Sequence, residues 1–183
     1  MNLHSLNTDV RTVEDERMLE AVKNVIEFAS AHGYRISSCE SFTAGLFCAV
    51  LGSVPGASSV LAGGFVTYQS YVKTIAAHVS TELIDHYGVI SAQCAAAMAR
   101  NTRELLETDY CVSFTGNAGP SAMEGKPAGD IFCAIDSKNK DTQVWNGILS
   151  LPRNELRKEA VRQMLEVLLE CMKHDASAQT LHA

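Results

Sequence analysis

Three polar, glycine-containing segments carry the residues whose types and spacing could do chemistry. They cover residues 39–45, 64–73 and 115–120. Each begins in or directly after an apolar run of strand length, and the loops that follow the strands of an α/β sheet are where such folds build small-molecule sites. The sequence therefore predicts a ligand site formed by three loops along one edge of a sheet.

Ser41 stands between a predicted strand and a predicted helix. A hydroxyl at such a turn can serve as a nucleophile, with the backbone N–H groups of the helix start holding the developing oxyanion. Alternatively, Ser41 and Thr43 only cap the helix. The segment is not the Gly-x-Ser-x-Gly turn of α/β-hydrolases, because Cys39 and Thr43 occupy the glycine positions.

A serine nucleophile needs a base, and the pair Tyr68 and Lys73 offers one. One helical turn from about Ser70 would bring Lys73 back toward the strand end that carries Tyr68. A lysine is a base at neutral pH only if burial lowers its pKa from about 10.4. The alternative is a solvated lysine beside a strand-end tyrosine. None of the six histidines lies in a segment with motif character, so a Ser-His-Asp triad is not expected.

The turn Thr115–Pro120 invites comparison with a phosphate loop, since Gly125 and Lys126 follow it. The spacing between the glycines does not match, and Pro127 stands where a magnesium-binding Ser or Thr is required. We expect either a backbone-lined ligand wall or a simple structural turn.

Arg153 and Arg157 flank the start of the last predicted helix. Cations there oppose the helix dipole unless an anion, such as a substrate phosphate, binds between them and the helix amides. Alternatively, Glu155 and Glu159 neutralise the two arginines on a solvated face. Metal-ligand spacing is absent from the sequence, so no metal is expected, and the Gly-x-Gly-x-x-Gly fingerprint is absent as well.

Composition narrows the class of protein. The chain has 183 residues, of which 46% are hydrophobic, and this is enough for one domain with its own core. A net charge of -6 argues against nucleic acid or an anionic membrane as partner. The six cysteines include no Cys-x-x-Cys pair, and the charged first thirty residues lack a signal-like apolar run. We expect a cytoplasmic protein with reduced thiols.

Hydrophobic periodicity predicts strands alternating with helices. The expected fold is a three-layer α/β/α sandwich with a mixed central sheet. We expect a loose arm over residues 1–11, a single domain over 12–173 and a frayed tail over 174–183. Helices are predicted over 13–32, 43–51, 70–77, 80–86 and 91–107 and from the N-cap Asn154, and strands over 34–39, 60–68, 110–114, 130–135 and 143–149.

Taken together, the motifs resemble the C-terminal domain of the CinA family, in order over about residues 20–170. The resemblance is carried by Glu40–Leu46, Gly64–Tyr68 followed by Lys73, Tyr87–Ser91, Thr115–Pro120 and Lys126–Gly129. It implies the sandwich fold and a homo-oligomer, taken as a dimer. Some members are nicotinamide-nucleotide amidases, which hydrolyse nicotinamide mononucleotide to nicotinate mononucleotide and ammonia without a cofactor.

The same resemblance implies a role for each candidate residue. Ser41 would be the nucleophile, with Tyr68 and Lys73 as its proton-handling partners. The small-molecule nucleotide would be bound by Thr43, Gly45, Thr115, Gly116 and either Arg153 or Arg157, the arginine reading the phosphate.

Three departures from the family pattern bear on activity. Family members usually have glycine where this chain has Ala44, a smaller polar segment where it has Tyr71, and a Gly-Gly pair within Ser121–Met123. If Ala44 needs a glycine-like backbone, or if Tyr71 fills the pocket, activity would be weakened or lost. The alternative function is therefore a degenerate paralogue that binds a nucleotide-like ligand or a protein partner without turnover.

Overall fold

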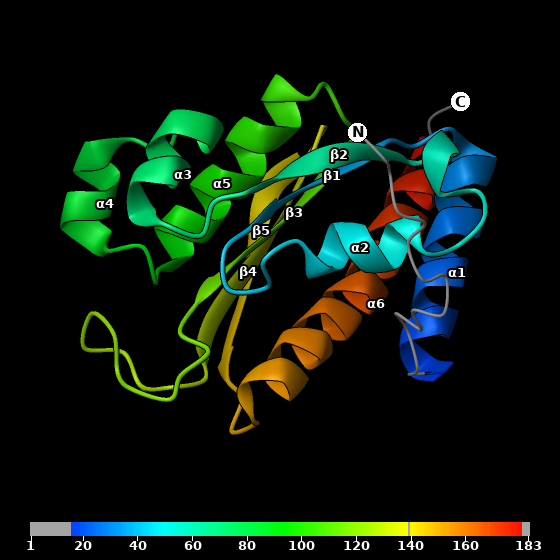
Figure 1. Ribbon diagram of the computed structural model, residues 1–183. Helices are drawn as coiled ribbons and strands as arrows, with labels where there is room; N and C mark the ends of the chain where they lie inside the picture. The colour runs from blue at the N-terminus through cyan, green and yellow to red at the C-terminus, as the bar shows by residue number, and fades with distance from the viewer. Residues whose placement is uncertain (1–15, 139, 181–183) are drawn as a thin grey trace, which may run out of the picture.

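A five-stranded sheet lies between two layers of helices (Figure 1). The computed structural model describes residues 16–138 and 140–180. The strands are β1 (Ile36–Glu40), β2 (Leu61–Val66), β3 (Tyr110–Gly116), β4 (Asp130–Ser137) and β5 (Lys140–Ile148). The helices are α1 (Glu16–His32), α2 (Leu46–Gly52), α3 (Ser70–Ala77), α4 (Thr81–Tyr87), α5 (Ala92–Leu105) and α6 (Arg153–Thr180), with a short 3₁₀ turn at Ala57–Ser59.

The sheet is mixed, and its strand order is β2-β1-β3-β4-β5. β1 pairs in parallel with both β2 and β3, whereas β4 and β5 are antiparallel additions. The three parallel strands therefore end at the same edge of the sheet, and the segments after them meet there. This arrangement confirms the predicted three-layer sandwich.

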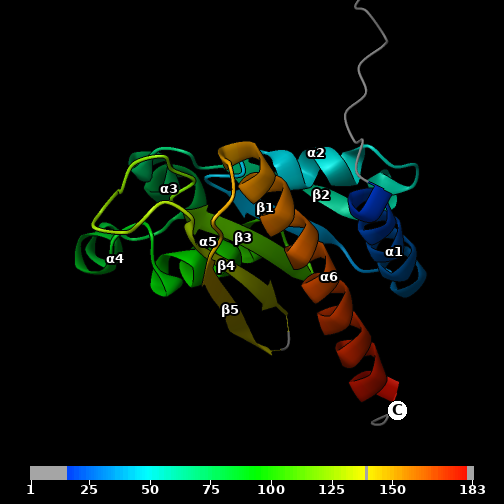
Figure 2. The same ribbon diagram turned by 90° about the horizontal axis from the view of Figure 1, so that it is seen from below.

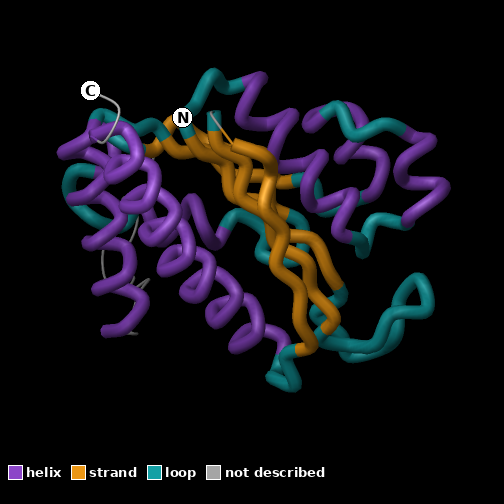
Figure 3. The backbone as a smooth tube through the Cα atoms, turned by 180° about the vertical axis from the view of Figure 1, so that it is seen from behind, coloured by secondary structure: helices purple, strands orange, loops and turns teal. Residues whose placement is uncertain are grey.

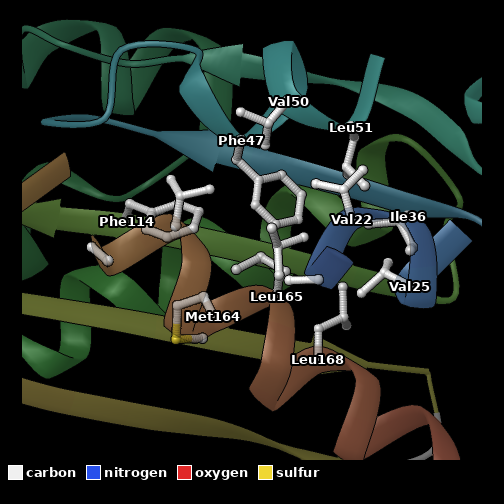
Figure 4. Close-up of a cluster of buried hydrophobic side chains, with 14 of the residues drawn as sticks. Val22, Val25, Ile36, Phe47, Val50, Leu51, Phe114, Met164, Leu165 and Leu168 are labelled. Carbon is white, nitrogen blue, oxygen red and sulfur yellow. The ribbon is translucent and has the colours of Figure 1, made fainter. Parts of the chain in front are cut away.

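The larger core lies between the sheet and the layer formed by α1, α2 and α6. Apolar side chains from these helices recur at helical spacing and meet the apolar side chains of β1 and β3. Figure 4 shows this cluster, which includes Val22, Val25, Ile36, Phe47, Val50, Leu51, Phe114, Met164, Leu165 and Leu168. Helix α2, which follows Ser41 in the chain, is thus held by packing against the sheet, α1 and α6.

The opposite face of the sheet is covered by α3, α4 and α5, as the view from behind shows (Figure 3). Ser80 and Ser91 cap α4 and α5, because their hydroxyl oxygens accept hydrogen bonds from the amides of Leu83 and Cys94. All six cysteines are free thiols, in agreement with the sequence. Within the described parts of the chain, no helix combines the length and apolarity that a membrane crossing needs.

The structure corrects the ends of two helices. α2 begins at Leu46 rather than at Thr43, because Ala44 and Gly45 adopt left-handed backbone angles with φ of 52° and 88°. α6 begins one residue before Asn154, so Asn154 is not its N-cap. The predicted arm over 1–11 lies outside the described residues, as do 181–183.

α6 also continues through residues 174–180, where a frayed tail was expected (Figure 2). Its last turns are attached to the sheet. Asp175 accepts a hydrogen bond of 2.8 Å from the hydroxyl of Tyr110 on β3 and forms an ion pair with Lys140 on β5. These contacts hold a polar helix end that the sequence pattern alone would leave loose.

Candidate active site

A pocket of about 390 Å³ opens at the edge where the three parallel strands end. Figure 1 shows the loop between β3 and β4 and the start of α6 at the same end of the sheet. Six of the nine predicted site residues line this pocket: Ser41, Tyr68, Lys73, Thr115, Gly116 and Arg153. Segments that are far apart in the sequence are therefore brought together largely as predicted.

Ser41 and Lys73 are in direct contact. The Nζ atom of Lys73 lies 3.0 Å from the Oγ atom of Ser41, and it donates a second hydrogen bond of 2.8 Å to the carbonyl oxygen of Thr67. Lys73 is only 1% exposed, and it sits in the first turn of α3. One helical turn from Ser70 does bring the amine back to the strand ends, as the spacing predicts.

Burial is the main influence on the ionisation of Lys73. Removal of the amine from water lowers its pKa, because the charged form loses its hydration. The neighbouring thiols of Cys94 and Cys39 would oppose this if they were ionised, but burial raises their own pKa values, that of Cys94 to about 12. At neutral pH the carboxylate of Glu124 is the remaining group whose charge raises the pKa of Lys73.

Tyr68 stands at the pocket beside an arginine rather than beside the serine. Its hydroxyl accepts a hydrogen bond of 2.5 Å from Arg153, whose other terminal nitrogen donates to the carbonyl oxygen of Gly119 at 2.7 Å. Within residues 16–138 and 140–180, no hydrogen bond joins Tyr68 to Ser41 or Lys73. Arg153 therefore links the start of α6 to the two loops on either side of the pocket.

Thr43, Gly45 and Arg157 do not line the pocket, although they were predicted to bind substrate. Arg157 donates a hydrogen bond of 2.6 Å to the carbonyl oxygen of Thr43, which is fully buried. Gly45 is the left-handed residue that precedes α2. These three residues shape the loop that carries Ser41, and the pocket's arginine is Arg153.

Glu40 has a role that the sequence reasoning missed. Its carboxylate is buried and accepts hydrogen bonds of 3.1 Å from the amides of Phe47 and Cys48, in the first turn of α2, and one of 3.2 Å from the hydroxyl of Ser38. A carboxylate at a helix N-terminus is favourable for the helix dipole. The amides of α2 that were expected to hold an oxyanion are therefore already occupied.

Another part of the pocket wall is formed by the end of β3 and the loop that follows it. Gly116 has a φ of 155°, and a Cβ atom there would lie 2.8 Å from both the carbonyl oxygen of Asp130 and the Cα atom of Ile131. The neighbouring Thr115 donates its hydroxyl to the carbonyl oxygen of Val89 at 2.6 Å. Only glycine fits at position 116, so the backbone itself forms this wall.

Asn117 shapes the rest of that loop, and it was not among the predicted site residues. Its side-chain amide donates to the carbonyl oxygens of Ser121 and Lys126, at 2.7 Å and 3.2 Å. Its side-chain oxygen accepts a hydrogen bond of 2.9 Å from the amide of Gly119. An asparagine before a glycine-rich turn was the available signal, since its side chain commonly bonds its own loop.

The three departures from the family pattern differ in their consequences. Ala44 does adopt a left-handed backbone, with φ of 52°, where glycine would be less strained. Tyr71 is 66% exposed and does not line the pocket. Ser121, Ala122 and Met123 do line it, so the substitutions there alter the wall of the pocket itself.

Known proteins match this chain closely in sequence. The model of the CinA C-terminal domain matches residues 18–172. The chain belongs to the CinA C-terminal domain family. A relative from Listeria welshimeri, with the provisional name of competence-damage inducible protein, is 42% identical over 133 residues, which cover 73% of this chain and 32% of the relative. A relative from Oceanobacillus iheyensis is 37% identical over 160 residues, 87% of this chain and 38% of the relative.

This CinA-family chain thus spans about a third of the length of these curated relatives. Solved structures agree with its fold. The competence/damage inducible protein CihA from Agrobacterium tumefaciens superposes with a TM-score of 0.83 at 29% identity, over 87% of this chain and 98% of that one. A CinA superfamily protein from Escherichia coli gives 0.82 at 24% identity over 91% and 99%, which shows the fold alone.

Proposed function

We propose that this chain is an amidase that hydrolyses the carboxamide of nicotinamide mononucleotide to nicotinate mononucleotide and ammonia. The observation that carries the proposal is a buried amine, that of Lys73, 3.0 Å from the hydroxyl of Ser41 in a pocket of small-molecule size. A serine beside a neutral amine is an activated nucleophile, and acyl transfer is the chemistry it performs. Membership of the CinA family, which includes such amidases, supports the choice of substrate.

In the first step, Lys73 acts as the base. Its neutral amine takes the hydroxyl proton while Oγ of Ser41 forms a bond to the carboxamide carbon. The carbonyl oxygen of Thr67 accepts an N–H of the amine, which helps to direct the lone pair of Nζ toward the serine. The contact favours Lys73 over Tyr68 as the immediate base.

The negative charge that develops on the carboxamide oxygen needs hydrogen-bond donors. The amides of α2 are engaged by Glu40, so we assign this role to the amide of Phe42, which lines the pocket and takes no hydrogen-bond partner from the described residues. The C–N bond then breaks, and the leaving nitrogen receives the proton from Lys73 and departs as ammonia. Water, deprotonated by the same amine, attacks the acyl-serine and releases the acid and the Ser41 hydroxyl.

Arg153 is the proposed reader of the phosphate. Two of its five N–H groups bond Tyr68 and Gly119, which holds the guanidinium at the pocket and leaves three for a ligand anion. Arg157 contacts the carbonyl oxygen of Thr43 and does not line the pocket, which supports Arg153 for this role. Tyr68 thus supports the arginine, and its own hydroxyl proton is available to the substrate.

Ammonia release from nicotinamide mononucleotide by the purified protein tests the proposal. We expect Ser41→Ala and Lys73→Met to lower kcat by about a thousandfold or more, since each removes a group that acts in the transition state. Ser53→Ala and Lys158→Met, which remove the same groups away from the pocket, should leave turnover unchanged. Absence of turnover by the unaltered protein, with the nucleotide still bound, would instead support the degenerate paralogue.

The phosphate assignment has its own test. Arg153→Ala should raise KM for nicotinamide mononucleotide by about tenfold to a hundredfold, the loss of a charge-assisted contact. The same variant should change KM for nicotinamide riboside, which has no phosphate, by much less. An equal change for the two substrates would show that Arg153 serves only to hold the loops.

A further inference from the structure

One carboxylate lines the pocket among the residues that the structure describes, and the proposed chemistry does not use it. It belongs to Glu124, on the loop between β3 and β4. Its Oε2 atom accepts a hydrogen bond of 3.1 Å from the amide of Ile90. Gly88 leaves room for it, because a Cβ atom on Gly88 would lie 2.7 Å from the same oxygen. The carboxylate is therefore held in place.

The charge of Glu124 reaches the reacting groups. It acts against burial by raising the pKa of Lys73, so it lies within electrostatic range of the amine that contacts Ser41. The other oxygen of the carboxylate, Oε1, takes no hydrogen bond from any described part of the chain. A free carboxylate oxygen near the nucleophile is available to a ligand.

The fixed charges of the pocket are few. Tyr68 apart, its ionisable lining residues within the described ranges are Lys73, Glu124 and Arg153. With the amine of Lys73 neutral in its role as base, one negative charge remains on the loop between β3 and β4 and one positive charge at the start of α6. A ligand that matches this pattern has a cationic part near the reacting carboxamide and an anionic part beside Arg153.

We propose that Glu124 is a specificity-determining residue that recognises the positive charge of a pyridinium ring. The inference rests on the proposed function and names the substrate class of the same site: N-alkylated pyridinium carboxamides that carry a phosphate. In nicotinamide mononucleotide the ring nitrogen is cationic and the phosphate anionic. Glu124 therefore separates this nucleotide from amides of the same shape with an uncharged ring.

Product release follows from the same charge. The acid formed in the reaction places a carboxylate on the ring, so the ring portion changes from cationic to overall neutral. Its attraction to Glu124 weakens at the moment when the amide has been cleaved. The residue thus favours substrate over product.

A pair of ligands that differ in ring charge tests the proposal. Oxidised nicotinamide mononucleotide has the cationic ring, whereas its 1,4-dihydro form keeps the carboxamide, ribose and phosphate on a neutral ring. Binding is measured by calorimetry with the full chain carrying Ser41→Ala, so that no turnover interferes. We expect the oxidised form to bind about tenfold more tightly, as for one charge pair in a partly solvated pocket.

Adding Glu124→Gln should bring the two affinities together, because glutamine can still accept the hydrogen bond from Ile90. Glu82→Gln, on the exposed first turn of α4, is the matched control and should leave the ratio unchanged. Equal weakening of both ligands, an unchanged ratio, or no binding of either one overturns the inference. If the proposed function alone fails, the unaltered protein releases no ammonia, while the ratio of the two affinities still depends on Glu124.

Discussion

At the scale of single residues, the proposed chemistry depends on the buried amine of Lys73. A buried amine is a cost to the folded state, since its charged form is poorly solvated and its neutral form gives up a proton that the unfolded chain keeps. In the proposed mechanism, this amine is the base that takes the proton of Ser41. The effect of this burial on the unfolding free energy can be measured separately from activity.

The burial of Lys73 should make the stability of the protein depend on pH. Because folding lowers the pKa of Lys73, the unfolded chain binds more protons between the folded pKa and about 10.4, so this residue's contribution to stability rises with pH over that window. We expect the unfolding free energy of the unaltered protein, minus that of Lys73→Met, to increase from pH 7 to 10 in urea titrations. Lys158→Met should give a flat difference, and a flat difference for Lys73→Met would contradict the lowered pKa.

The left-handed backbone of Ala44 should also affect stability. A non-glycine residue in the left-handed region costs about 1 kcal/mol, and Ala44 has φ of 52° and an exposed side chain with little packing to lose. Ala44→Gly should therefore raise the unfolding free energy, by up to about 1 kcal/mol. Ala49→Gly, at an exposed position inside α2, should lower it by about 0.5–1 kcal/mol. Equal signs for the two variants would refute the strain at Ala44.

At the scale of elements, Glu40 connects β1, the Ser41 loop and α2. It is the last residue of β1, and its carboxylate accepts the amides of Phe47 and Cys48 across the loop that carries Ser41. If glutamine replaces Glu40, its side-chain NH₂ group faces a backbone N–H of α2, and two donors then meet in a buried site. The cap therefore fixes the backbone of the loop that carries Ser41 as well as the start of α2.

We expect Glu40→Gln to lower the unfolding free energy by about 2 kcal/mol, as for loss of a buried, charge-assisted hydrogen bond. Because the loop shifts with the cap, kcat should fall as well, with a smaller effect on KM. Glu82→Gln, an exposed acidic residue in the first turn of α4, should change stability much less. A Glu40→Gln protein of full stability would mean that α2 holds the loop by packing alone.

Sequence patterns predicted the fold and much of the pocket because both depend on local signals. Polar residues at the ends of apolar runs placed Ser41, Tyr68 and Thr115 at one edge, and helical spacing brought Lys73 to them. The start of α2 was missed because residue types fit a helix where the backbone of Ala44 does not.

Other features depend on contacts between distant residues, which no local pattern encodes. Arg153 and Arg157 lie one turn apart with similar surroundings in the sequence, and only the fold turns one to the pocket and the other to Thr43. The cap by Glu40 joins the end of β1 to amides seven and eight positions further along the chain. The end of α6 depends on Asp175 meeting Tyr110, 65 positions away.

At the scale of the whole molecule, the pocket and the anchoring of α6 are separate. The pocket involves the first residue of α6, whereas Asp175 near its other end contacts Tyr110 and Lys140 of the sheet. Asp175→Ala should lower the unfolding free energy by about 2 kcal/mol, since it leaves the buried hydroxyl of Tyr110 without a partner. Tyr110→Phe should cost less, because it leaves Asp175 still paired with Lys140.

The double variant Tyr110→Phe, Asp175→Ala should be little less stable than Asp175→Ala alone, because the two residues share one hydrogen bond and their effects are not additive. Urea titrations of the four proteins give this coupling. Glu170→Ala, which breaks an exposed pair with Lys173, is the control and should have a small effect. KM and kcat for the amide should be unchanged in all of these proteins at temperatures where they remain folded. A fall in kcat that follows the stability loss would show instead that α6 transmits strain from the sheet to Arg153.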